Sequence, residues 1–215
     1  AVRDVASFDG SGVDIALFSA GAEVSRQYAP RAAAAGCVVI DNTSEFRNDD
    51  DVPLVVPEVN PQAIARFGAR RIIANPNCST IQMVVALKPL HDAAGIERIN
   101  VATYQSVSGA GREAVEELAE QSVALISGRG PVKPRVLPAQ IAFNVVLQVD
   151  RFMENGYTRE EMKLLWETRK ILGDDTLRVN ATAVRVPVFF GHSEAVSIET
   201  GRKLGRDFTL AELKE

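Results

Sequence analysis

Short β-branched runs alternate with helix-like segments through the first third of the chain. Residues 12–18, 37–40 and 71–74 are apolar runs of strand length, and helix-like residues separate them. Pro30 is expected to interrupt the helix that follows the first run. Strands that alternate with helices predict a parallel sheet covered by helices, which places this part of the chain in the α/β class.

The pattern changes to a period of two from Ile99 onward. The side chains of Ile99, Val101, Thr103 and Gln105 fall on one face of a long predicted strand. Residues 141–149 and 184–188 repeat the alternation and predict further strands, whereas residues 112–126 and 158–171 predict amphipathic helices. A helix is also expected after Cys78, with Pro89 kinking or ending it. The two patterns predict two domains that meet near Cys78.

The composition excludes several classes of protein. The 215 residues are 46% hydrophobic and 24% charged with a net charge of −4, so nothing suggests a nucleic-acid partner. The apolar runs are far shorter than the roughly 20 residues that cross a bilayer, and the first residues resemble no targeting signal. We therefore expect a cytoplasmic protein. Two cysteines and two histidines also predict neither a metal site nor a disulfide framework.

The two cysteines have different sequence surroundings. Cys37 lies in an apolar, strand-like run, where a buried and inert thiol is expected. Cys78 follows a strand and opens a helix, and the N–H groups and dipole of a helix start favour a thiolate. Local sequence leaves two interpretations open: Cys78 is a nucleophile, or it is a core residue beside a helix cap formed by Asn77 or Ser79.

Five short segments together resemble a known family. Each alone is a weak signal, but all five occur in the family's order and spacing along the whole chain. They are Ser19-Ala20-Gly21, Asp41-Asn42-Thr43-Ser44-Glu45-Phe46-Arg47, Asn75-Pro76-Asn77-Cys78-Ser79-Thr80, Tyr104-Gln105-Ser106-Val107-Ser108-Gly109-Ala110-Gly111 and Val186-Pro187-Val188-Phe189-Phe190-Gly191-His192. The chain therefore resembles the bacterial aspartate-β-semialdehyde dehydrogenases.

The resemblance implies a fold and a reaction. Residues 1–77 would be the remainder of a Rossmann-type NADP-binding domain, and residues 78–215 a glyceraldehyde-3-phosphate-dehydrogenase-like α+β catalytic and dimerisation domain. The implied reaction is reversible, NADPH-dependent reduction of aspartyl phosphate to aspartate semialdehyde and phosphate, in lysine (diaminopimelate), threonine and methionine synthesis. In the oxidative direction Cys78 attacks the aldehyde, hydride passes to NADP, and inorganic phosphate cleaves the thioester. The resemblance also implies a homodimer or a dimer of dimers.

The resemblance assigns roles to the residues around Cys78. His192 looks like the acid/base group, since the pKa of an unperturbed imidazole, about 6.5, lies near working pH. Gln105 would orient the substrate, and the Asn77 amide would help to hold an oxyanion.

Charged side chains are expected to bind the substrate and phosphate. Arg185 would hold the α-carboxylate through two parallel hydrogen bonds, and Glu160 would receive the ammonium group. Arg47 and Lys163 match phosphate-binding residues, and Asn42 begins the segment that Arg47 ends. Without the resemblance, Glu160 and Lys163 would be interpreted as a surface ion pair. Local sequence leaves Arg47 open between a solvated loop residue and a phosphate-binding residue.

Two turns built from small side chains could approach a dinucleotide cofactor closely. They are Ser19, Ala20 and Gly21, and Ser108, Gly109, Ala110 and Gly111. The family's first strand with its glycine-rich loop is absent from this sequence, as are the closing segments beyond Glu215. We therefore expect these 215 residues alone to bind NADP poorly, and either to self-associate through the apolar edge at residues 14–18 or to need the missing segment restored.

Two alternatives compete with this interpretation. One is an enzyme like the N-acetylglutamyl-phosphate reductases, whose substrate has no ammonium group. The other is a non-catalytic dimerisation fragment. Glu160 together with Arg185 favours a zwitterionic substrate, which argues against the first alternative.

Overall fold

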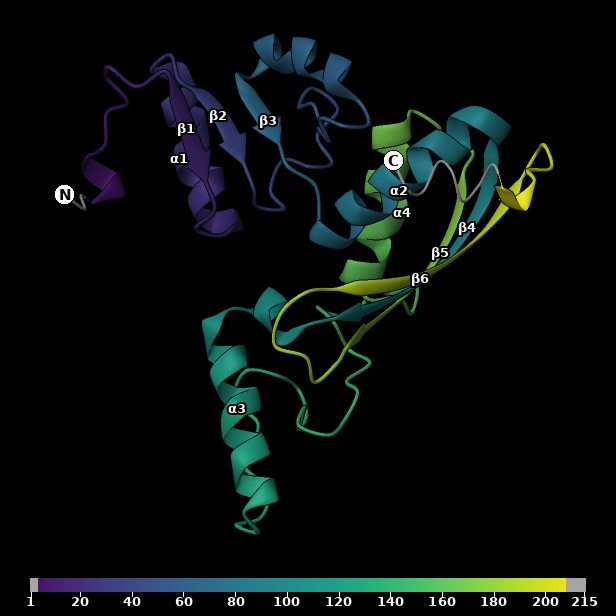
Figure 1. Cartoon of the computed structure of the whole chain (residues 1–215). Coiled ribbons are helices and arrows are strands. Elements are labelled where there is room, and N and C mark those ends of the chain that lie inside the picture. The colour runs from purple at the N-terminus through teal and green to yellow at the C-terminus, as the bar shows by residue number, and fades with distance from the viewer. Residues whose placement is uncertain (1–3, 208–215) are drawn as a thin grey trace. The chain divides into compact units, whose positions relative to one another are not determined.

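The structure is a computed structural model that describes residues 4–207 (Figure 1). It contains two compact units. Unit 1 comprises the described parts of Ala1–Ala93, Trp166–Thr176 and Leu204–Glu215, and unit 2 comprises Ala94–Leu165 and Leu177–Lys203. Both units combine helices with strands, in keeping with the expected α/β class. The domain boundary after residue 77 stays a prediction, because a compact unit need not end where a sequence domain ends.

Unit 1 contains a three-stranded parallel sheet in the order β1-β2-β3. Its strands are β1 (Ile15–Phe18), β2 (Val38–Asp41) and β3 (Ile72–Ala74), so all three strands predicted in the first third are confirmed. Among the described residues β1 pairs only with β2, and the Ile15 and Leu17 side chains are 60% and 78% exposed. The expected apolar strand edge is therefore present.

The helices of unit 1 continue past their prolines, which corrects the expectation at Pro30. The helical elements are η1 (Val5–Ser7), α1 (Ala22–Ala34), η2 (Pro61–Ala69) and α2 (Cys78–Ala94). Pro30 lies inside α1 and Pro89 inside α2, so Pro89 does not end its helix either. Ala29 and Ala32 are buried on either side of Pro30. Packing of this face against the core outweighs the hydrogen bond that a proline removes.

Unit 2 contains a mixed sheet in the order β5-β4-β6. β4 (Ile96–Gln105) pairs in parallel with β5 (Arg178–Arg185) and antiparallel with β6 (Ser193–Thr200). Alternate residues of β4 are buried from Ile99 to Gln105, which confirms the predicted face. The sequence interpretation missed β6. It also extended the strand of β5 too far, because Pro187 has no N–H to donate and the chain leaves the ladder after Arg185.

The predicted helices of unit 2 are confirmed to within one residue. η3 (Val107–Ala110) leads into α3 (Arg112–Ile126), and α4 (Arg159–Leu172) begins in unit 2. A capping box fixes the start of α4. The N–H of Thr158 donates to Glu161 Oε2 at 2.7 Å, and the N–H of Glu161 donates to Thr158 Oγ1 at 3.3 Å.

The strand predicted over residues 141–149 is wrong. Only Val146 forms a bridge there, with Arg185. The N–H groups of Ile141 and Ala142 donate to Gln121 Oε1, at 2.9 and 3.1 Å, instead of joining a ladder. Phe143 then has a φ of 57°, which no strand accommodates.

Side chains of α3 hold the irregular chain that follows it. Glu117 is fully buried, and its Oε2 accepts the N–H groups of Arg135 and Val136, both at 2.7 Å. Gln121 is also buried and donates from Nε2 to Glu117 Oε1 at 3.3 Å. The two side chains therefore satisfy backbone groups that have no strand partner.

No helix among residues 4–207 is long and apolar enough to span a membrane.

Candidate active site

Cys78 is exposed and is the first residue of α2. The Oδ1 atom of Asn77 accepts the N–H groups of Ser79 at 2.9 Å and Thr80 at 3.3 Å, so Asn77 caps the helix. The expected helix start and the capping role of Asn77 are confirmed. Because a thiol at this position lies at the positive end of the helix dipole, the geometry favours a thiolate.

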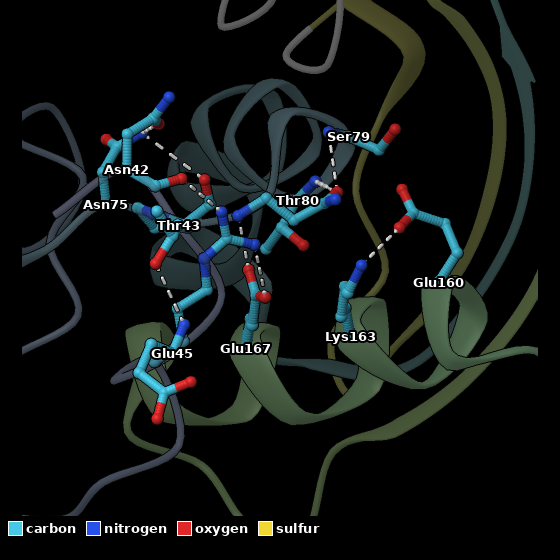
Figure 2. Close-up of polar contacts among 12 residues, drawn as sticks. Asn42, Thr43, Glu45, Asn75, Ser79, Thr80, Glu160, Lys163 and Glu167 are labelled. Atoms are coloured by element: carbon cyan, nitrogen blue, oxygen red, sulfur yellow. Dashed lines mark hydrogen bonds and ion pairs between the residues drawn. The ribbon is translucent and has the colours of Figure 1, made fainter. Parts of the chain in front are cut away.

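A buried carboxylate holds the turn before Cys78. Glu167 accepts the N–H of Asn77 on Oε2 at 2.6 Å and a hydrogen from Arg47 Nη1 on Oε1 at 3.1 Å. The Glu167 and Arg47 side chains are 1% and 9% exposed, and Arg47 also donates to the backbone oxygen of Asn42 at 3.0 Å. The interpretation of Arg47 as a solvated loop residue is therefore wrong. One carboxylate, that of Glu167 (labelled in Figure 2), therefore binds both this guanidinium and the backbone before the cysteine.

Amide and hydroxyl groups organise the carboxyl ends of β2 and β3. Asn75 donates from Nδ2 to Asn42 Oδ1 at 2.6 Å (Figure 2). Asp41, the buried last residue of β2, accepts from the hydroxyls of Ser25 at 2.8 Å and Thr43 at 2.9 Å. Ligand sites of parallel α/β sheets usually form at this end of the strands.

Cys37 differs from Cys78 in its exposure to solvent. It is fully buried in the core of unit 1, and its Sγ lies 3.7 Å from the backbone oxygen of Gly10. A thiol with this burial is shielded from reagents. The expectation that Cys37 is a buried thiol is confirmed.

Gln105, Glu160 and Lys163 form a connected polar group in unit 2. Gln105 Nε2 donates to Glu160 Oε1 at 3.1 Å, and both side chains are buried. Lys163 Nζ donates to Glu160 Oε2 at 2.9 Å, drawn in Figure 2, and to Asp150 Oδ2 at 3.0 Å. Burial opposes protonation of Lys163, but the charges of Glu160 and Asp150 outweigh it and raise the pKa of the amine. The surface-pair interpretation of Glu160 and Lys163 is therefore wrong.

Arg185 and His192 both contact Ser106. Arg185 Nη1 donates to the Ser106 backbone oxygen at 2.8 Å, while His192 Nδ1 accepts the Ser106 N–H at 3.1 Å. Burial and the charge of Arg185 lower the pKa of His192, against a smaller opposing effect of Glu160. A Cβ added at Gly109 would lie 3.0 Å from Arg185 Nη1 and 3.2 Å from His192 Nε2. Only glycine therefore fits this close approach without displacing them.

Two family models cover most of the chain. Residues 1–67 match the NAD binding domain of semialdehyde dehydrogenases, and residues 87–215 match their dimerisation domain. The chain belongs to the semialdehyde dehydrogenase family.

Two similar relatives of this semialdehyde dehydrogenase have the same name. The chain is 67% identical over 93% of its length to aspartate-semialdehyde dehydrogenase from Shewanella sp. (strain DB6705), and 63% identical over 100% of its length to the enzyme of that name from Shewanella violacea. It spans 59% and 63% of the lengths of these two relatives. A solved structure of aspartate semialdehyde dehydrogenase II from Vibrio cholerae, complexed with ASA, has a TM-score of 0.97 and 59% identity, and covers 99% of this chain and 63% of its own.

The small-residue turn at the start of α1 is exposed, and its contact with a dinucleotide stays a prediction. Ser19, Ala20 and Gly21 lie between β1 and α1, all three are exposed, and a Cβ at Gly21 would meet nothing within 4 Å. Gly21 is the N-cap of α1 and forms no side-chain capping bond. A helix start of this kind, at the carboxyl end of a parallel strand, suits phosphate binding.

The second small-residue turn lies in unit 2. Ser108, Gly109 and Ala110 belong to η3, and Gly111 is the N-cap of α3 with φ +94°. Ser108 lies beside Ser106, since their Oγ atoms are 3.0 Å apart. Gly109 lies beside His192, since a Cβ added at Gly109 would be 3.2 Å from His192 Nε2. A cofactor contact for this turn stays a prediction.

The predicted site residues form two groups, one in each unit. Unit 1 brings together Asn42, Arg47, Asn77 and Cys78, whereas unit 2 brings together Gln105, Glu160, Lys163, Arg185 and His192. Sequence reasoning missed Glu167, Ser106 and Asp150. Glu167 could have been noticed as an acidic residue on the buried face of a predicted amphipathic helix. No sequence pattern pointed to Ser106 or Asp150.

Proposed function

We propose that this semialdehyde dehydrogenase catalyses the reversible, NADPH-dependent reduction of aspartyl phosphate to aspartate semialdehyde and phosphate. The observation that carries the proposal is the charge arrangement around Gln105. Gln105 bonds Glu160 at 3.1 Å, and Arg185 lies opposite Gln105 in the sheet register. A carboxylate bonded to Gln105 and a guanidinium from the paired position on the neighbouring strand suit a substrate with an ammonium and a carboxylate group.

Cys78 is the proposed nucleophile. Its thiolate attacks the acyl carbon of aspartyl phosphate, the C–S bond forms, and phosphate leaves with its bonding electron pair. A nicotinamide cofactor, when bound, supplies the hydride that reduces the thioester. The C–S bond then breaks and the electron pair returns to sulfur. The exposed position of Cys78 at the start of α2 supports this role.

Arg47 and Lys163 are the proposed phosphate-binding residues. Among residues 4–207, the buried Nε of Arg47 has no hydrogen-bond acceptor, so one donor of this guanidinium is not used within the chain. Lys163 is held by two carboxylates and stays protonated, because its pKa is raised. Phosphate would compete with Asp150 and Glu160 for this amine.

We propose NADP as the cofactor and a homodimer as the assembly. The solved structure of aspartate semialdehyde dehydrogenase with NADP from Candida albicans has a TM-score of 0.68 and 28% identity to this chain. The match covers 94% of this chain and 55% of that one. The dimer is supported by the dimerisation-domain match and by apolar side chains exposed in unit 2, among them Phe143 and Leu147, each 69% exposed.

The test is phosphate-dependent reduction of NADP with two aldehydes. Aspartate semialdehyde should be oxidised, and N-acetylglutamyl semialdehyde, which lacks the ammonium group, should react at least about 100-fold more slowly in kcat/KM. Glu160→Gln should lower kcat/KM for aspartate semialdehyde and so bring the kcat/KM values of the two aldehydes closer together. A preference for the acetylated aldehyde would replace the proposal with the reductase alternative, and no activity toward either would leave the dimerisation-fragment interpretation.

A further inference from the structure

His192 has a hydrogen-bond arrangement that determines which ring nitrogen carries its proton. Nδ1 lies 3.1 Å from the backbone nitrogen of Ser106, and that N–H is directed at it. A backbone N–H can only donate, so Nδ1 has to be an acceptor without a proton. We infer that His192 works as the neutral imidazole with its proton on Nε2, donating a hydrogen bond to the reacting oxygen, and that Ser106 is the positioning residue that fixes this tautomer.

The Ser106 side chain supports the same assignment. Its Oγ lies 3.1 Å from His192 Nδ1 and 3.0 Å from Ser108 Oγ, so the hydroxyl can donate to either atom. A proton on Nδ1 would face the Ser106 N–H directly and remove the bond between them. This contact therefore fixes the tautomer of the neutral ring, with the proton on the other nitrogen, Nε2.

Glycine at position 109 keeps a side chain away from Nε2 of His192. Gly109 faces Nε2 without a side chain, and an added Cβ would come within 3.2 Å of it. Burial and the charge of Arg185 both disfavour the imidazolium, and only Glu160 opposes them. The neutral ring is therefore the form that meets the substrate at neutral pH.

A donor that keeps its proton is sufficient for the reaction proposed above, and the identity of the reacting oxygen rests on that proposal. Attack of the Cys78 thiolate on the aldehyde carbon forms the C–S bond and moves a pair of electrons onto the carbonyl oxygen. The oxygen holds this charge until the pair returns and the C=O bond forms again as hydride leaves the carbon, for which a bound nicotinamide cofactor would be the acceptor. No proton is gained or lost on oxygen, so a hydrogen bond from Nε2 stabilises the charged species without proton transfer.

The direct test is the nitrogen spectrum of ¹⁵N-histidine-labelled protein. The chain has two histidines, and His91→Asn assigns the remaining signals to His192. At neutral pH we expect one protonated nitrogen, Nε2, and one acceptor nitrogen, Nδ1. A proton on Nδ1, or an imidazolium, would overturn the inference. The spectrum needs no substrate, so failure of the proposed enzyme activity would leave this result unaffected.

Two substitutions at Ser106 separate its N–H from its hydroxyl. Ser106 has a φ of −65°, which proline also adopts, so Ser106→Pro removes the N–H with little change of backbone, while Ser106→Ala removes only the hydroxyl. We expect the alanine variant to keep the tautomer. The proline variant should raise the imidazolium-to-imidazole ratio of His192 about tenfold at a given pH, as loss of one hydrogen bond predicts. Equal imidazolium-to-imidazole ratios of His192 in the two variants would contradict the role of the N–H. If circular dichroism shows that the proline variant is unfolded, the nitrogen spectrum of the unsubstituted protein decides alone.

Discussion

The helices α1 and α2 both begin beyond a strand of the same parallel sheet, but their first turns are built differently. The N-cap of α1 is Gly21, with φ +99° and no side-chain capping bond. The N-cap of α2 is Asn77, whose side chain accepts two N–H groups and whose own N–H is bound by Glu167. A helix start without a side-chain cap suits an anionic ligand, whereas a capped one holds its first residue rigidly. The comparison shows how one sheet edge supplies both a candidate anion site and a candidate nucleophile.

The largest effect should come from removing the sulfur at the capped helix start. Cys78→Ala should lower kcat at least about 10⁴-fold, because no other group in the proposed reaction forms the thioester. Steady-state assay of phosphate-dependent NADP reduction measures it. Cys37→Ala is the control, with activity retained and a modest loss of stability from a small cavity. Comparable losses in both variants would contradict the assignment of the nucleophile.

Removal of the buried carboxylate should be the next largest effect, and it falls on stability. Glu167→Ala should lower the free energy of unfolding by about 3–5 kcal/mol, because Arg47 is left buried without its counter-charge. Urea denaturation gives the value. The matched control is Glu116→Ala, which breaks the exposed pair with Arg112 and should cost under about 1 kcal/mol. Equal costs would mean that the Glu167 network does not hold the helix start.

A side chain at the start of α1 should weaken cofactor binding. Gly21→Ala adds a methyl group and strains the backbone at φ +99°, and we expect about a tenfold loss of NADP affinity by titration calorimetry. Gly12→Ala imposes a similar strain at φ +72°, with nothing near its Cβ, and lies outside the helix start. Unchanged affinity in Gly21→Ala, or an equal loss in Gly12→Ala, would remove this turn from the proposed cofactor site.

The smallest effect should come from the cap itself. Asn77→Ala should lower the free energy of unfolding by about 1 kcal/mol. It should also move the alkylation of Cys78 by iodoacetamide to higher pH, because the helix start that favours the thiolate becomes less ordered. Cys37 should stay unlabelled in both proteins. An unaltered pH profile would show that Asn77 has no part in activating the thiol.

Local patterns in the sequence were enough to predict the elements that bury one face. α3 matches its expected bounds of residues 112–126, and the alternation along β4 is confirmed from Ile99 to Gln105. The strand predicted over residues 141–149 failed because Gln121, twenty residues earlier, accepts its N–H groups. A period-two pattern carries no information about such a distant acceptor.

The same limit applies to the candidate site. Cys78 could be placed at a helix start because strand and helix signals meet there, and this placement is confirmed. The role of Glu167 depends on Arg47 and Asn77, which lie 120 and 90 residues away along the chain. Contacts over this separation follow from the folded chain and not from local residue order.

The bonding of Glu117 and Gln121 has a consequence for how this protein can vary. Their side chains accept four N–H groups in all, those of Arg135, Val136, Ile141 and Ala142, and bond to the backbone irrespective of the side chains there. Replacement of exposed residues in this stretch should therefore be neutral, so the stretch can drift in sequence over evolution while its path is kept. Glu117 and Gln121 themselves should tolerate replacement less well, since the loss of either leaves two backbone N–H groups without their acceptor.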